Sequence, residues 1–474
     1  IDGRLMCCDN PDFGRGLFPP HLRSNLSPVV FPAEKPPNTY RVFVLGSSAA
    51  LGSPDYAYGF GRVLDRMLSD RYTEAEIEVV TVAMTAINSH VVLPIARECA
   101  RHEPDLFIIY LGNNEVVGPF GPGTVLSRLP RQSSAVQMRI ALSSTRIGQL
   151  FELLGGWVAA SPEMPVTQQA SLLFLDNLVP WGDPGLDSVY AHFAENLKGI
   201  RDAGLAGGAK VILCNVASNL RDCPPFAPQH RPGLSKADDE QWERIYAEGK
   251  ASESAGNLAR AIERYAAAAE IDDRHADLQF RLARAYWSLG EYEQARELYI
   301  AARDLDCLRF RADSRINQII RSVAEEKPGS DVRFADVVAA VADRSPQQVP
   351  GAEFFYEHVH FTFQGNHLLA RTVLEQLEAA LPERFPRAHG TRDVLTVEQS
   401  AKLLAHTEWD HRRIIGNVLK AYVGSPPFVG QIYHEEGVKR LGDQFRKLHL
   451  STLPRGLEDA VEQYRNAVSN THLR

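Results

Sequence analysis

The chain has 474 residues, 44% of them hydrophobic, which is enough apolar side chain to bury more than one core. Its formal net charge is -8, and its lysines and arginines form no cluster dense enough to follow a phosphate backbone, so nucleic acid is excluded as an expected partner. No apolar run approaches the length of a membrane-spanning helix. The six cysteines lack C-x-x-C spacing, which argues against a zinc site and a disulfide framework.

The first 39 residues are expected to form an extended arm, because Pro19-Pro20 and Pro36-Pro37 interrupt any helix. From residue 40 onward, apolar runs of strand length alternate with amphipathic stretches of helix length. This alternation predicts an α/β fold, in which a parallel sheet carries helices on both faces. The elements expected up to residue 216 are strands at 41–46, 77–83, 105–112 and 210–216, and helices at 59–71, 90–101 and 188–203.

The stretch 119–184 interrupts this alternation with turn residues and one helical piece around 139–154. Its length predicts a cap or insertion that faces the substrate, since long irregular loops in compact domains are commonly functional. The α/β pattern returns at 329–384. The segment before that return is therefore expected to be inserted into one α/β domain.

That inserted segment contains a repeat with a period of 34 residues. Gly256 and Gly290 are 34 positions apart, and so are Ala261 and Ala295. Small residues at this period, where paired helices cross, resemble the tetratricopeptide repeat. The resemblance implies two repeats between about residues 242 and 306, which would offer a concave surface to a protein or peptide partner.

Near the end of the chain, Leu457–Val468 matches Leu258–Ala269 in the placing of Leu, Ala and Tyr. Two interpretations stay open: a further repeat that continues beyond Arg474, or an ordinary amphipathic terminal helix. The division expected from all these patterns is an arm at 1–39, an α/β domain at 40–238 and 309–385, inserted repeats at 239–308, and a helical C-terminal extension at 386–474.

Two adjacent serines, Ser47 and Ser48, follow the first predicted strand, at the edge where open α/β sheets place ligands. A serine nucleophile needs a base and a group that orients the base. Glu357 precedes His360 by three residues in a predicted loop, and an acid at this spacing can hold the imidazole in the tautomer that accepts a proton. His358 is expected to be exposed, and no metal is expected because no third ligand is fixed beside the two histidines.

Polar residues follow the other predicted strands as well. Asn113 or Asn114, after the third strand, can present a side-chain amide to an oxyanion, and backbone N–H groups after the second strand can add a donor. Asn88 and Asn219, after the second and fourth strands, are candidates either for substrate contact or for turn chemistry.

Taken together, these blocks resemble the SGNH hydrolases, also called GDSL esterases and lipases. Gly46-Ser47-Ser48-Ala49-Ala50-Leu51-Gly52 is similar to the family's G-D-S-x-x-x-G block, Gly112-Asn113-Asn114-Glu115 to G-x-N-D, and Glu357-His358-Val359-His360 to D-x-x-H. The resemblance implies a three-layer, flavodoxin-like sheet domain. It also implies that Ser48 is the nucleophile, His360 the base and Glu357 the residue that orients the base.

The same resemblance implies an oxyanion site made of the Ser48 N–H, the Asn114 amide and the N–H of Ala83, which stands where the family has glycine. Ser47 and Glu115 each replace an aspartate of the family pattern, and Ala83 and Glu357 depart from it too, so a divergent member is expected. We also count Ser47, Asn113 and Glu115 among the residues expected to contact substrate, together with Asn88 and Asn219.

The activity implied is hydrolysis of an ester through an acyl-enzyme, on an acylated carbohydrate, lipid or peptide, without a cofactor. Two alternatives stay open: acyl transfer to an alcohol by the same site, and a largely non-catalytic role in which the repeats recruit protein partners. Since the sequence begins at Ile1, the compartment also stays open between the cytoplasm and an extracytoplasmic place reached through an upstream signal or anchor.

Overall fold

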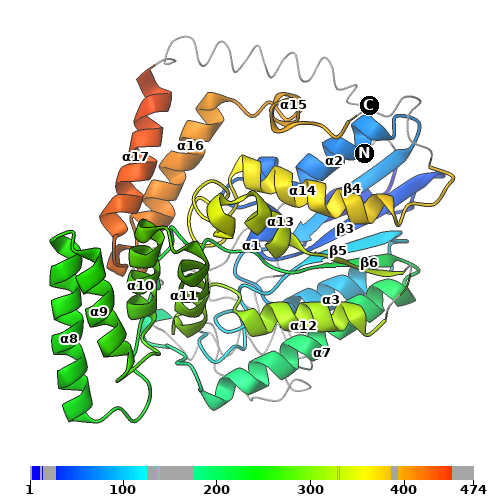
Figure 1. Ribbon diagram of the computed structural model, residues 1–474. Coiled ribbons are helices and arrows are strands. Elements are labelled where there is room, and N and C mark those ends of the chain that lie inside the picture. The colour runs from blue at the N-terminus through cyan, green and yellow to red at the C-terminus, as the bar shows by residue number, and fades with distance from the viewer. Residues whose placement is uncertain are drawn as a thin grey trace, which may run out of the picture.

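Figure 1 shows the computed structural model of the chain. It describes residues 3–10, 13, 28–124, 136, 138, 174–327, 329, 331–385 and 393–450. The predicted helical piece at 139–154, most of the 119–184 stretch and the repeat-like segment 457–468 lie outside these residues. None of the helices described is long and apolar enough to cross a membrane.

A parallel sheet of five strands forms the core of the α/β part (Figure 1). Its strand order is β4-β3-β5-β6-β7. The two strands β3 and β5 are buried along their whole length, because helices cover the apolar side chains that point to either face. The strands are β3 (Thr39–Gly46), β4 (Glu76–Ala83), β5 (Leu106–Tyr110), β6 (Lys210–Cys214) and β7 (Val332–Ala335).

Helices lie on both faces of this sheet. In Figure 1, α2, α13 and α14 cover one face, and α3, α7 and α12 cover the other. This three-layer arrangement confirms the α/β class predicted from the sequence. The bounds are α2 (Phe60–Arg71), α3 (Ser89–Cys99), α7 (Pro184–Ala206), α12 (Ser314–Glu325), α13 (Val337–Arg344) and α14 (Phe363–Glu378), with short 3-10 turns at Tyr56–Tyr58 and Pro346–Gln348.

The order of the strands places a topological switch point at the carboxyl ends of β3 and β5. The chain leaves β3 toward the edge strand β4, whereas it leaves β5 in the opposite direction toward β6, and ligands bind where such connections diverge. Gly46 ends β3 directly beside Tyr110 of β5. A Cβ at Gly46 would lie 2.1 Å from the Tyr110 carbonyl oxygen, so only glycine fits at this end of the strand.

Four helices inserted between β6 and α12 form the repeats, as predicted. They are α8 (Lys236–Ser254), α9 (Leu258–Ala269), α10 (Ala276–Leu289) and α11 (Tyr292–Leu305). Ala261 and Ala295, one repeat period apart, are fully buried where the helices cross. Gly249 leaves room for the ring of Tyr265, which a Cβ at that glycine would approach to 2.5 Å.

The C-terminal extension is helical, as predicted, and packs back on the α/β part. Its elements share a buried apolar cluster with Tyr356, which lies just before the predicted acid and base. The elements are α15 (Val397–Leu403), α16 (Glu408–Val418), a π-helical turn (Leu419–Val423), a 3-10 turn (Phe428–Gly430) and α17 (His434–Leu450).

The N-terminal arm contains more structure than the expected extended chain. Its strands β1 (Met6–Cys8) and β2 (Val30–Pro32) pair antiparallel. Phe31 is buried, and its ring lies 5.5 Å from the ring of Phe43 in β3. This part of the arm therefore belongs to the core, because an apolar side chain between the prolines finds a place against the sheet. The domain boundaries given above stay predictions.

Candidate active site

Ser48 lies where β3 turns into the short helix α1 (Ser48–Leu51). Ser47 occupies the N-cap position with an extended backbone, and its side chain makes no capping hydrogen bond. The helix ends at Gly52, whose φ of +94° favours glycine. Gly59 approaches so closely that a Cβ at Gly52 would lie 2.4 Å from its Cα. This tight turn fixes Ser48 at the carboxyl edge of the sheet.

The predicted base lies in a closed loop, residues 355–361, which we call the base loop. A bridge between Phe355 and Phe361 closes it, and the N–H of Tyr356 donates to the carbonyl of His360 at 2.9 Å. Glu357 Oε1 accepts the backbone N–H of His360 at 2.9 Å and lies 2.6 Å from His360 Nδ1. One carboxylate therefore positions both the backbone and the ring of the histidine.

The base loop brings His360 against Ser48. His360 Nε2 lies 2.9 Å from Ser48 Oγ, although the two residues are 312 positions apart in the sequence. The exposed fractions of Ser48, Glu357 and His360 are only 7%, 4% and 4%. Burial lowers the pKa of His360 to about 4, so its imidazole is neutral at pH 7. A neutral Nε2 at this distance can accept the serine proton, as a serine nucleophile requires.

Asn114 lies at the next strand end and offers a side-chain donor. Its Nδ2 donates to the Ile87 carbonyl at 3.1 Å, and the amide retains a second N–H. Ala83 is the last residue of β4, opposite Gly46. In the turn that follows, Ala86 has a φ of +60°, which an alanine rarely adopts. The bond from Asn114 fixes this turn beside its amide, so Ala86 joins Ala83 as a candidate among the backbone N–H groups expected after the second strand.

Glu115 and Asn88, both predicted substrate contacts, bond to neighbouring segments. Glu115 accepts the backbone N–H of Ser89 at 3.0 Å and its hydroxyl at 2.6 Å. The hydroxyl of Ser89 in turn accepts a hydrogen bond from Asn196 Nδ2 at 3.0 Å. Asn88 Nδ2 donates to the Pro119 carbonyl at 2.8 Å. These bonds tie the start of α3 to the segment that follows β5, which is a scaffold role.

Asn113 and Asn219 are also engaged with the scaffold. Asn113 Oδ1 accepts the N–H of Ala312, just before α12, at 3.1 Å. Asn219 Nδ2 donates to the Glu357 carbonyl at 2.8 Å, and its backbone N–H donates to the His358 carbonyl at 2.9 Å. Asn219 therefore anchors the base loop from the segment that follows β6 and holds Glu357 and His358 by their backbone carbonyls.

Replacing Glu115 with glutamine is expected to change how stability depends on pH. Burial raises the pKa of Glu115 to about 7, although hydrogen bonds from Ser89 oppose the shift. Because the folded pKa lies above the unfolded value of 4.5, the stabilisation is complete below that value and is lost as the pH rises through 7. Relative to the unsubstituted protein, the Glu115→Gln variant should gain up to about 3 kcal/mol in free energy of unfolding across this range.

Urea unfolding at about pH 5 and about pH 8 measures this difference. Glutamine keeps an acceptor for Ser89 and removes the titrating proton, so the two proteins should converge at the lower pH. A stability difference that stays constant between the two pH values would contradict a buried carboxyl with a raised pKa.

His358 is buried, which corrects the expectation that it would be exposed. Its ring lies between 5.4 and 5.8 Å from the rings of Phe226, Phe310 and Phe428. Burial among them, together with the neighbouring His360 and Arg311 charges, lowers the pKa of His358 well below its ordinary value. The three phenylalanines come from separate parts of the sequence, so no local pattern indicated this environment.

Glu357, His358 and His360 are also the one group in the described part of the chain whose donor atoms, all within 4.8 Å of one another, could together hold a metal ion. Both ring nitrogens of His360 already have neighbours, Glu357 at Nδ1 and Ser48 at Nε2. His358 Nδ1 likewise contacts Glu357. A metal here would have to separate these contacts, so the arrangement fits nucleophilic catalysis better than metal binding.

Residues 254–306 match the family model of the tetratricopeptide repeat, which confirms that resemblance. A search of curated proteins finds no match. Among solved structures, a GDSL-like lipase from Bacteroides thetaiotaomicron VPI-5482 matches with 11% identity and a TM-score of 0.30, covering 72% of this chain and 89% of that one. An alpha/beta hydrolase enzyme from the metagenome of Lake Arreo, Spain, matches with 11% identity and a TM-score of 0.31, covering 72% and 97%. Structural similarity this weak supports no conclusion about the function of this chain.

Proposed function

We propose that the chain is a serine hydrolase that cleaves an ester through an acyl-enzyme, with Ser48 as nucleophile, His360 as base and Glu357 as orienter. The observation that carries the proposal is one chain of contacts. Ser48 Oγ lies 2.9 Å from His360 Nε2, and the other ring nitrogen lies 2.6 Å from the Glu357 carboxylate. The proposed substrate is an acylated carbohydrate, lipid or peptide.

In this proposal Ser48 Oγ attacks the ester carbonyl while His360 Nε2 takes its proton. The tetrahedral oxyanion accepts hydrogen bonds from the Ser48 N–H, the Asn114 amide and a backbone N–H of Ala83 or Ala86. His360 then gives the proton to the leaving alcohol, and the C–O bond breaks to leave the acyl group on Ser48. Water attacks next, and His360 repeats the two proton transfers to release the acid and restore the serine.

Because His360 is buried, Glu357 is needed to stabilise the imidazolium that forms during the reaction. Burial disfavours the imidazolium and lowers the pKa of His360 to about 4, so the free ring is a neutral acceptor. The same burial makes the imidazolium costly once the serine proton has moved. A carboxylate at Nδ1 offsets this cost at the moment it arises, because the charges are opposite and close.

Covalent labelling with a fluorophosphonate tests this proposal. The oxygen of an activated serine bonds to phosphorus and fluoride leaves, whereas an ordinary hydroxyl reacts far more slowly. The label is expected on Ser48, in the unsubstituted protein and in the Ser47→Ala variant. Mass spectrometry of the digested protein locates it. A label on Ser47, or an undiminished label on the Ser48→Ala variant, would overturn the assignment.

Acyl transfer is a second candidate, favoured by one observation. Ser48 and His360 are nearly inaccessible, and a site that excludes water favours an alcohol acceptor over hydrolysis. The tetratricopeptide match supports a separate role in protein binding, which is compatible with either reaction.

A further inference from the structure

A segment of the C-terminal extension lies against the base loop of the proposed site. We call residues 419–436 the strap. Its π-helical turn carries Tyr422, whose ring lies 5.4 Å from the ring of His360. Phe428, further along the strap, lies 5.4 Å from the ring of His358. In the described part of the chain, the rings that neighbour His360 are therefore one from the base loop itself and one from the strap.

The repeats hold the far end of the strap through Tyr433. Its hydroxyl donates to Glu253 of α8 and accepts from Arg281 of α10 at 2.9 Å. The guanidinium of Arg284 lies over its ring, 3.7 Å from the centroid. Arg284 also bonds Glu436, three residues further along, at 3.1 Å. The repeat face thus contacts both an aromatic ring and the acid that follows it.

The backbone is irregular at both ends of the strap. Tyr433 has a φ of +55°, a strained conformation for a bulky residue that persists only when its surroundings impose it. Tyr422 lies in a π-helical turn, an irregularity that often marks functional positions. The contacts on α8 and α10 supply the constraint at Tyr433. Their loss would let that backbone relax.

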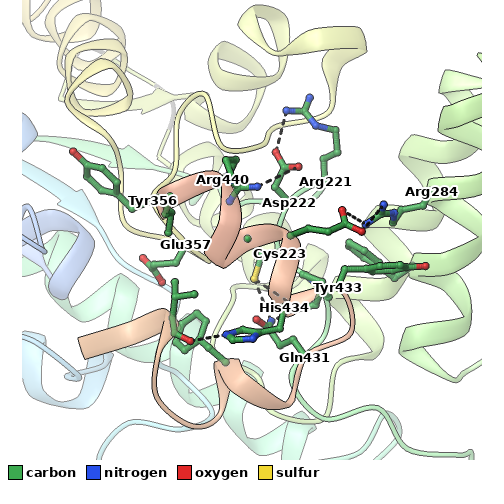
Figure 2. A pocket seen from close by; sticks show the side chains of 17 residues that line it. Arg221, Asp222, Cys223, Arg284, Tyr356, Glu357, Gln431, Tyr433, His434 and Arg440 are labelled. Carbon is green, nitrogen blue, oxygen red and sulfur yellow. Dashed lines mark hydrogen bonds and ion pairs between the residues drawn. The ribbon is translucent and has the colours of Figure 1, made fainter. Parts of the chain in front are cut away.

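The seam beneath the strap is lined by both charged and apolar side chains and is incompletely filled. A pocket of about 60 Å³ lies between the strap, α10 and the base loop, and Figure 2 shows Glu357 on one side of it and Tyr433 with Arg284 on the other. Arg440 of α17 faces Asp222 across it at 3.7 Å. Val423 and Phe428 of the strap are buried in apolar clusters, so release of the strap also withdraws these two side chains from those clusters.

We propose that the repeat helices α8 and α10 are a recognition site for this chain's own strap, with Tyr433 as its anchor, and that release of the strap uncovers Ser48 and His360. The inference rests on the proposed function of that pair. In the structure the strap itself is seated on the repeat face, through Tyr433 and Glu436. A protein segment with an aromatic residue followed by an acid at the third position would compete for the same face.

We call the contact of the strap with α8 and α10 the latch. A charge swap on the full chain tests it. The Arg284→Glu variant sets two acids against each other at Glu436 and removes the guanidinium from the ring of Tyr433. It should label at Ser48 with a fluorophosphonate about tenfold faster and should raise hydrogen exchange across 419–436. The double variant Arg284→Glu/Glu436→Arg should return both quantities toward their original values. Arg260→Glu, which breaks an exposed Arg-Glu pair on α9, is the matched control and should change neither.

The outcomes separate the latch from the proposed function. Unchanged exchange in the strap, or unchanged labelling of Ser48 in a protein whose strap exchanges faster, overturns the latch and leaves the hydrolase proposal standing. A double variant that behaves like Arg284→Glu also overturns it, because recognition of Glu436 would then play no part. If Ser48 is labelled in none of the proteins, opened strap included, the proposed function fails and this inference fails with it.

Discussion

Replacing Ser48 with alanine is expected to lower hydrolysis of a short p-nitrophenyl ester by about 10⁴-fold or more. The substitution removes the oxygen that would carry the acyl group and leaves His360 Nε2 with no hydroxyl to deprotonate. Donors such as the Asn114 amide remain, so a small residual rate above the uncatalysed reaction is also expected. Steady-state release of p-nitrophenol measures the effect.

The Ser69→Ala variant is the control for this loss. Ser69 Oγ donates to the Asp65 carbonyl at 2.8 Å on the exposed face of α2, so the same chemical change there should leave turnover as it was. The deletion at Ser48 removes one atom from a buried turn, and urea unfolding shows whether both variants keep the fold. A Ser48→Ala protein that retains more than about a tenth of the turnover would refute the acyl-enzyme mechanism.

The strands and the contact of Glu357 with His360 could be predicted because both depend on local sequence. The contact of Ser48 with His360, 312 positions away, was expected only from the resemblance to the SGNH hydrolases. The run that ends at Gly46 is apolar at successive positions, which is typical of a strand covered on both faces. Ser48 follows that strand directly, and Glu357 reaches His360 across three residues of one loop. In each case the physical cause lies within a few residues of its effect.

The roles of the buried amides could not be predicted, because their partners are distant in the sequence. Asn219 bonds Glu357, 138 positions later, and Asn113 bonds Ala312, 199 positions later. A sequence places such an amide after a strand without showing whether its side chain turns toward the crevice or toward another segment. The contact of Tyr422 with His360 could not be predicted either, because it depends on where the C-terminal extension packs.

Replacing Glu357 with glutamine is expected to lower kcat by about 10⁴-fold while KM changes little. An amide at this position can donate to His360 Nδ1, which fixes the ring proton on Nε2 and prevents that atom from accepting the proton of Ser48. The variant also lacks the negative charge that offsets the imidazolium, which burial disfavours by lowering the pKa of His360. Steady-state kinetics on the same ester separates kcat from KM.

Glu353→Gln supplies the matched control, because it makes the same change close to the base loop. Glu353 bonds Arg221 at 2.6 Å and the Gly351 N–H at 2.9 Å, so its loss disturbs local structure and charge without altering the partner of His360 Nδ1. A fall in kcat confined to the Glu357 variant would follow from the wrong tautomer and the missing charge. An equal fall in kcat in the two variants would instead show that distortion of this part of the chain causes the effect. The role of Glu357 in the mechanism would then be refuted.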